Sequence, residues 1–146
     1  MRVETDNDDV DADLVTPHGY VEWGEGPQSI QVATVEELDA LLDRVDAEAR
    51  VGQRPVLALV GLGGTRYLTV GLGDDDVGLT YNDSSDWRSW SSLGDLTGDD
   101  EVGFWMGNQP TYVRRRELVP IDLARQAVRE LYDTGERSQL VRWYEP

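Results

Sequence analysis

Two stretches with helical periodicity, one early in the chain and one close to its end, constrain the fold most strongly. The first follows Thr34, and Thr34 with Glu37 forms a capping box in which each side chain accepts from the other residue's amide. Its apolar residues recur at helical spacing, and the helix is predicted to end near Gly52. The predicted buried face consists of Val35, Leu38, Leu41, Leu42 and Val45.

The second helix is predicted before Gly135, a residue type that often ends helices in the left-handed conformation. A short final strand is predicted around Trp143. The apolar face of this helix consists of Leu123, Ala124, Ala127, Val128, Leu131 and Tyr132.

The segments between and before these helices favour short strands. Turns of glycine or aspartate separate them, and connections this short make neighbouring strands antiparallel. The fold class is therefore α+β: an antiparallel meander with two helices packed on one face. Residues 82–100, by contrast, are predicted to form a long polar surface loop. The predicted strands are residues 20–23, 29–33, 55–60, 66–72, 77–81, 102–106, 111–114 and 117–119.

The length of 146 residues fits one domain, which is predicted to span residues 19–146. Residues 1–18 are rich in aspartate and poor in apolar residues, which predicts a flexible acidic arm. This acidic start is unlike a secretory signal, and no apolar run approaches the ~20 residues that span a bilayer. We therefore expect a cytoplasmic protein without membrane contact.

The formal net charge is −16, from 29 acidic and 13 basic residues. Such a surface repels phosphate backbones, so direct nucleic-acid binding is disfavoured. Three interpretations of the charge stay open: solubility, attraction of a basic protein partner, or carboxylates that bind cations or transfer protons.

Residues that catalysis requires are scarce. There is no cysteine, and the single histidine, His18, stands beside the predicted arm, which disfavours a catalytic triad or a zinc site. The glycines of residues 61–64 lack the lysine of a phosphate-binding loop. Leu79 and Ser85 stand where a calcium loop beginning at Asp74 would need glycine and glutamate. We therefore expect no enzyme, no cofactor and no metal.

The tryptophans fall into two classes. Trp23, Trp105 and Trp143 lie in predicted strands, so they are expected in the core or on a sheet face. Trp87 and Trp90 lie among polar residues. They either fold back onto the sheet or face a partner, since tryptophan is common among binding hot spots.

Two stretches resemble the Imm1 family of bacterial immunity proteins. One comprises residues 34–43, Arg54-Pro55 and residues 68–73; the other comprises Tyr132-Asp-Thr-Gly-Glu-Arg137 and Val141-Arg-Trp143. The resemblance covers most of residues 21–146. Family members often carry proline or a small residue directly after the arginine of the Thr-Gly-Glu-Arg motif, whereas Ser138-Gln139 follows here.

The resemblance implies a small α+β cytoplasmic protein, encoded beside a polymorphic toxin, that binds its cognate toxin domain and occludes the active site. Many such toxins resemble nucleic-acid deaminases. The resemblance supplies no catalytic residue. A deaminase needs a basic groove for nucleic acid, so an acidic inhibitor would be steered towards it.

The expected toxin-binding surface joins the acidic tip at residues 74–76 to the segment from Asn82 to Glu101. Trp87 or Trp90 would be its apolar anchor, and carboxylates would surround it. The candidate residues are Asp74, Asp75, Asp76, Asp83, Asp86, Trp87, Trp90, Asp95, Asp99, Asp100 and Glu101.

Two other function classes stay open. An acidic DNA mimic would inhibit a nuclease or DNA-binding protein, although mimics tend to spread charge along helices and strands, whereas the acids here gather in turns. A carboxylate-based hydrolase would need two acids in one cleft, one of them with a raised pKa.

Overall fold

The structure is a computed structural model that describes residues 19–24 and 28–146. The predicted acidic arm, residues 1–18, therefore lies outside the described residues. The elements are β1 (Gly19–Trp23), β2 (Gln28–Val32), α1 (Val35–Val51), β3 (Val56–Gly61), β4 (Arg66–Leu72), β5 (Asp76–Val77), β6 (Leu79–Asp83), β7 (Arg88–Leu93), β8 (Glu101–Met106), β9 (Gln109–Arg114), a 3₁₀ turn (Arg115–Glu117), β10 (Val119–Pro120), α2 (Ile121–Thr134) and β11 (Arg142–Tyr144).

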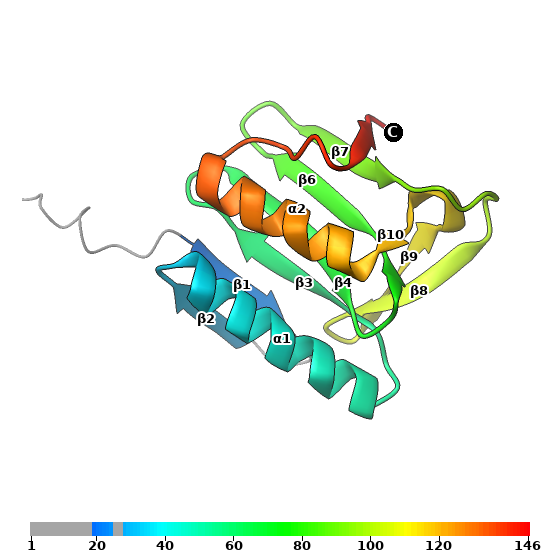
Figure 1. Cartoon of the computed structure of the whole chain (residues 1–146), viewed down its shortest axis with the longest axis horizontal. Helices are drawn as coiled ribbons and strands as arrows, with labels where there is room; N and C mark the ends of the chain where they lie inside the picture. The colour runs from blue at the N-terminus through cyan, green and yellow to red at the C-terminus, as the bar shows by residue number, and fades with distance from the viewer. Residues whose placement is uncertain (1–18, 25–27) are drawn as a thin grey trace, which may run out of the picture.

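One twisted, mostly antiparallel sheet forms the body of the protein (Figure 1). Its main path runs β11-β7-β6-β4-β3-β1-β2, so the strands β3, β4, β6 and β7 follow one another as a meander. The β1–β2 hairpin joins the β3 edge, and β11 joins the β7 edge. The predicted α+β class and its meander are confirmed.

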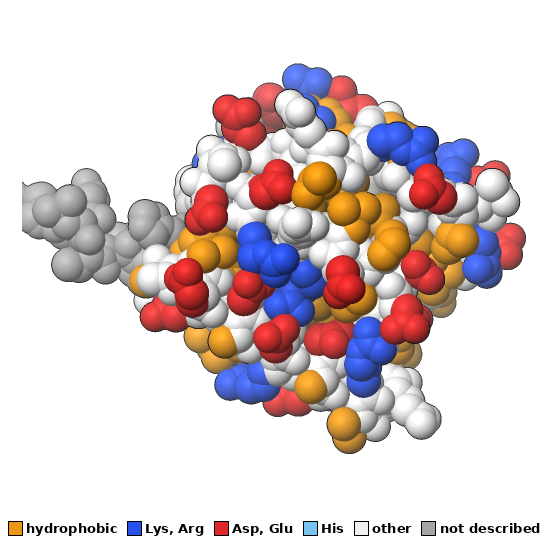
Figure 2. Space-filling view, in the orientation of Figure 1, with side chains coloured by type: hydrophobic (Ala, Val, Ile, Leu, Met, Phe, Trp, Pro, Cys, Tyr) orange, Lys and Arg blue, Asp and Glu red, His pale blue; other side chains and the backbone are white. Residues whose placement is uncertain are grey.

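Both helices lie on the same face of the sheet (Figure 1). They bury most of the apolar faces that the periodicity predicted, although Val35, Leu123 and Tyr132 are half-buried. The opposing strands contribute an apolar row at every second residue, such as Ala58 and Val60 of β3. Between the helices, the Asp39 carboxylate of α1 accepts hydrogen bonds from Arg125 and Arg129 of α2 at 3.2 and 3.0 Å. Acidic and basic side chains therefore intermix on this side (Figure 2).

The opposite face of the sheet is partly covered by the β8–β9 hairpin. Phe104 of β8 is fully buried, and a Cβ at Gly71 of β4 would come within 2.8 Å of its ring. A Cβ at Gly78 would likewise come within 2.7 Å of Val113 of β9. These two glycines allow the hairpin to approach the sheet closely, and the hairpin leaves the rest of that face open.

The predicted loop over residues 82–100 is wrong. β6 continues to Asp83, a four-residue turn follows, and β7 runs from Arg88 to Leu93 with β6 and β11 on either side. The prediction failed because β7 is polar: its serines either face the open side of the sheet or bond to the backbone, as when the Ser92 hydroxyl donates to the Glu117 carbonyl.

Smaller corrections concern the second half of the chain. The strand predicted at residues 111–114 begins two residues earlier, because Gln109 and Pro110 also belong to β9. Proline is tolerated there because β9 is an edge strand, where no neighbouring strand needs its missing N–H. Residues 77–81 form β5 and β6, which are interrupted at Gly78. Residues 117–119, predicted as one strand, contain the end of the 3₁₀ turn and the start of β10.

The predicted helix ends are largely confirmed. The Thr34 hydroxyl accepts from the Glu37 amide at 3.1 Å, although the Glu37 carboxylate accepts from the amide of Ala33 rather than that of Thr34. Gly135 has φ 77°, and its amide donates to the Leu131 carbonyl, which closes α2. The Gly135 carbonyl in turn accepts from Arg66 of β4 at 2.6 Å, so the helix end is tied to the sheet.

Replacing Gly135 with alanine should lower the free energy of unfolding by roughly 1–2 kcal/mol, because a side chain is strained at positive φ. The new Cβ would also lie 3.1 Å from the Arg66 guanidinium. Gly64→Ala is the matched control, since Gly64 also has positive φ but a Cβ there would meet nothing within 4 Å. Urea unfolding should show the larger loss for Gly135→Ala, and equal losses would refute a role for the Arg66 contact.

Candidate functional site

Seven of the acidic residues predicted for the toxin-binding surface gather at one end of the sheet. Residues 74–76 form the turn from β4 into β5, and residues 95–101 lead from β7 into β8. The two segments come together because β10 pairs with β5 while the Gly94 amide donates to the Arg116 carbonyl. We call this the acidic end; its members are Asp74, Asp75, Asp76, Asp95, Asp99, Asp100 and Glu101, all exposed.

Arginines pair with four of these seven carboxylates. The pairs are Arg50–Asp75 and Arg142–Asp95, each at 3.1 Å, Arg115–Asp100 at 3.3 Å and Arg116–Asp99 at 3.4 Å. All are solvent-exposed, so each pair adds little to stability and can exchange for a partner's cation. Among the described ion pairs none involves Asp74, Asp76 or Glu101.

Three other predicted residues lie at the opposite end of the sheet, in and beside the β6–β7 turn. Asp83 ends β6 beside Arg66, and Asp86 and Trp87 belong to the turn itself. Because β6 pairs with β4 from Val70 to Arg66, roughly five residues at about 3.4 Å each separate this turn from the acidic end, or about 15–20 Å. The structure thus divides the predicted surface into two groups.

The turn holds its shape through Asp83. The Asp83 carboxylate accepts from the hydroxyls of Thr65 and Ser85, each at 2.7 Å, and these hydrogen bonds hold the pKa of Asp83 below its usual value. Trp87 stands on this turn at φ 60°, with 89% of its surface exposed. A bulky residue is strained at positive φ and gains nothing from burial here, so the fold itself gives no reason for this tryptophan.

Trp90 differs from Trp87 because it packs within the protein. It lies on the helix side of β7, 5.5 Å from the ring of Tyr81, with the guanidinium groups of Arg88 and Arg137 at 4.6 and 4.3 Å from its ring centre. Trp90 and Trp143 both line an open cavity of about 690 Å³. Of the two alternatives left by the sequence, Trp90 folds back onto the sheet and Trp87 points to solvent.

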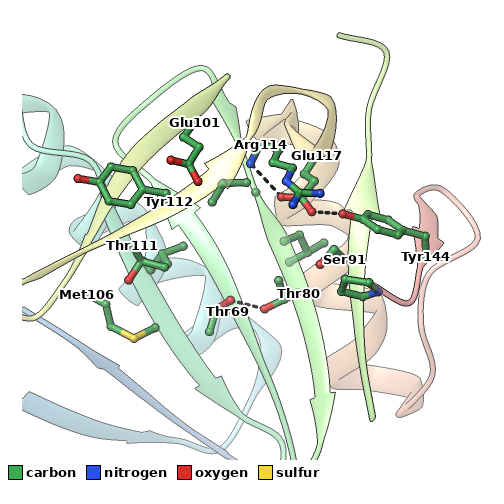
Figure 3. A pocket seen from close by; sticks show the side chains of 15 residues that line it. Thr69, Thr80, Ser91, Glu101, Met106, Thr111, Tyr112, Arg114, Glu117 and Tyr144 are labelled. Atoms are coloured by element: carbon green, nitrogen blue, oxygen red, sulfur yellow. Dashed lines mark hydrogen bonds between the residues drawn. The ribbon is translucent and has the colours of Figure 1, made fainter. Parts of the chain in front are cut away.

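A groove lies on the helix-free face, between the sheet and the β8–β9 hairpin (Figure 3). Its volume is about 400 Å³. Thr69, Thr80 and Ser91 form its floor, one from each of β4, β6 and β7, because the register places them side by side. Met106 and Tyr112 stand on the hairpin side, and the remaining wall includes Glu101, Arg114, Glu117 and Tyr144. We call this the hydroxyl groove.

Hydrogen bonds fix part of the hydroxyl groove (Figure 3). The Thr69 and Thr80 hydroxyls bond to each other. The Glu117 carboxylate accepts from the Arg114 amide at 2.9 Å and from the Tyr144 hydroxyl. Burial, together with the negative charge of Glu117, raises the pKa of Tyr144 above its ordinary value, because both disfavour the phenolate.

Sequence reasoning identified the acids but missed the groove. The one signal was the presence of Thr69 and Thr80 within predicted strands, where apolar residues are usual, whereas Ser91 lay in the segment predicted as a loop. Recognising it requires the register of three strands and the course of the hairpin. Within the described residues, no group of three or more His, Asp or Glu side chains is placed to hold a metal ion, and no helix is long and apolar enough to cross a membrane.

Comparison with known families gives one match: the model of the family described as Immunity protein Imm1 covers residues 26–145. The chain belongs to the Imm1 family. Membership implies an immunity protein, which binds a cognate toxin. The match spans the acidic end, the β6–β7 turn and the hydroxyl groove. No curated protein matches the chain.

In this Imm1 protein the Thr-Gly-Glu-Arg stretch has a structural explanation. Gly135 ends α2 in the left-handed conformation, and Arg137 lies over the Trp90 ring at 4.3 Å. A guanidinium over an indole face is attracted by the ring's negative potential. The stretch therefore joins α2 to β7 on the helix side, away from the hydroxyl groove.

Replacing Glu117 with glutamine should lower the pKa of Tyr144 towards its ordinary value, because the nearby negative charge is removed. A raised native pKa also means that the pair's contribution to stability is complete below the unfolded-state pKa of about 10 and is lost as pH rises through the native value. Phenolate absorbance, with Tyr144→Phe subtracted to isolate this residue, measures the shift. An unchanged titration in Glu117→Gln would refute the coupling.

Proposed function

We propose that this Imm1 protein binds and occludes the active site of a cognate toxin domain of the nucleic-acid deaminase type, in the cytoplasm of the cell that makes both. The observation that carries this proposal is membership of an immunity family combined with a cluster of exposed carboxylates at one end of the sheet. A toxin that grips nucleic acid presents basic side chains, and these are what such a cluster attracts.

Neutralisation in this scheme needs no chemistry from the immunity protein. Long-range attraction between a protein of net charge −16 and a basic toxin accelerates encounter. The exposed arginine pairs of the acidic end can then open and give their carboxylates to the toxin at little cost. Once bound, the immunity protein would keep nucleic acid out of the toxin's groove.

The two alternative functions receive less support from the structure. A DNA mimic would spread carboxylates along helices and strands in place of phosphates, whereas the carboxylates of the acidic end gather in and beside the β4–β5 and β7–β8 connections. A hydrolase needs an acid with a raised pKa. Asp83 and Glu145 have shifted pKa values, and both are lowered, by hydroxyl hydrogen bonds and by Arg88 respectively.

Reversing charge at the acidic end should slow association with the toxin. In Asp74→Lys with Asp76→Lys, both positions are exposed and take part in no described ion pair, so the fold should tolerate the change. We expect association to slow about tenfold at low salt and the difference to shrink as salt screens the charges. Stopped-flow mixing with the toxin domain encoded beside this gene, inactivated by mutation, measures the rate.

The control for charge reversal is Asp133→Lys with Glu136→Lys, which makes the same change in net charge at exposed positions at the far end of α2. It should slow association less than the acidic-end pair. If both pairs slow association equally, net charge alone steers the encounter and the acidic end is not the contact. If the wild-type protein does not bind this toxin, the proposed function itself is wrong.

Replacing Trp87 is a second test, because relief of its backbone strain should raise stability, whereas loss of a contact with the toxin should lower affinity. Trp87→Gly should raise the free energy of unfolding by roughly 1 kcal/mol, since glycine adopts φ 60° without strain. The same change should weaken toxin binding about tenfold if the ring is a contact. Thermal unfolding and calorimetric titration measure the two effects. A more stable variant with unchanged affinity would remove Trp87 from the interface.

A further inference from the structure

We propose that the hydroxyl groove receives a positively charged side chain, an arginine or lysine, from a protruding segment of the toxin domain. The inference rests on the proposed function and deepens it, because it adds an anchoring site on a face that the acidic residues alone did not indicate. Four observations support it: a hydroxyl on the floor that makes no hydrogen bond with a described residue, the charge of the wall, the character of the rim, and the position of the groove on the sheet.

The floor contains a polar group without a partner. Ser91 is 7% exposed and lines the groove, yet its hydroxyl makes no hydrogen bond with any described residue. In contrast, the neighbouring Ser92, which faces the other side of β7, accepts from the Leu79 amide and donates to the Glu117 carbonyl. The Ser91 hydroxyl is therefore open to a donor that enters the groove, and its oxygen can accept a hydrogen bond from that donor.

The wall favours a cation. Glu117 accepts two hydrogen bonds, from Arg114 and Tyr144, and an ionised carboxylate has lone pairs for further donors. Glu101 is exposed at the groove and takes part in no described side-chain hydrogen bond or ion pair. Arg114 is the one basic residue of the lining. Arg116 lies beside the lining, 5.8 Å from the centre of the Tyr144 ring, and is paired with Asp99, so Glu101 has no cationic partner among the described residues. A hydroxyl floor between carboxylates suits a group that carries several donors and a positive charge.

The rim and the size fit a long side chain with an apolar stem. Tyr112 is 59% exposed and Met106 is 38% exposed, both on the hairpin side of the groove. Tyrosine and methionine are enriched at protein interfaces, and their surfaces can pack against the methylene groups of an arginine or lysine. A volume of about 400 Å³ holds one such side chain with part of the segment that carries it.

The groove also lies between the two groups of predicted contact residues. Along β6 and β7, the Trp87 turn is at one end, Thr80 and Ser91 are in the middle, and the acidic end follows Leu93. A toxin domain with one side chain in the groove would therefore extend towards both ends of the sheet. One docking position would then account for contacts that are about 15–20 Å apart along the strands.

Paired substitutions at Ser91 test the proposal with little change of shape. Threonine and valine have the same size and both favour strands, but only threonine keeps the hydroxyl. We expect Ser91→Val to bind the inactivated toxin domain encoded beside this gene about tenfold more weakly than Ser91→Thr, as for a lost hydrogen bond to a charged group. Calorimetric titration gives the affinities, and thermal unfolding confirms that both variants fold.

Glu101→Arg is the second variant, because this exposed position can change without disturbing the core. It should weaken binding at least tenfold by placing a like charge beside the incoming cation. Equal affinities for Ser91→Val and Ser91→Thr would overturn the groove proposal whatever Glu101→Arg does, while leaving the proposed function intact. Failure of the wild-type protein to bind this toxin would overturn the proposed function and the groove with it.

Discussion

Packing of both helices on one face of a single sheet is the constraint from which the rest of the structure follows. Alternation along each strand sends one row of apolar side chains into the helices and the next row to the opposite face. That opposite face must therefore be polar or be covered. The β8–β9 hairpin covers part of it, through Phe104 over Gly71 and Val113 over Gly78, and the uncovered remainder becomes the hydroxyl groove.

The charge of the protein acts differently at long range and at short range. The net value of −16 describes a long-range field, which the fold does not change. Locally, arginines compensate many of the acids, as where Asp39 joins α1 to α2 and where Asp75, Asp95, Asp99 and Asp100 each hold a guanidinium. At the acidic end, four of the seven carboxylates are therefore paired with arginines of the same chain, and three take part in no described ion pair.

The sequence was most informative where structure depends on neighbouring residues. Three local features could be predicted: the capping box at Thr34, the apolar face of α1 and the end of α2 at Gly135. β7 could not, because its serines resemble a loop until β6 and β11 pair with it. The groove depends on the register of three strands and on two glycines that admit a hairpin from elsewhere in the chain, so no local pattern reveals it.

We propose above that the toxin binds the helix-free face of this Imm1 protein. Hydroxyl-radical footprinting of the complex with the inactivated toxin domain tests it most directly, because it reports the exposure of individual side chains. We expect strong protection of Tyr112 and Met106, which are exposed beside the groove, and unchanged labelling of Leu140, which is exposed in the segment between α2 and β11. Protection of Leu140 with Tyr112 and Met106 still fully labelled would contradict it.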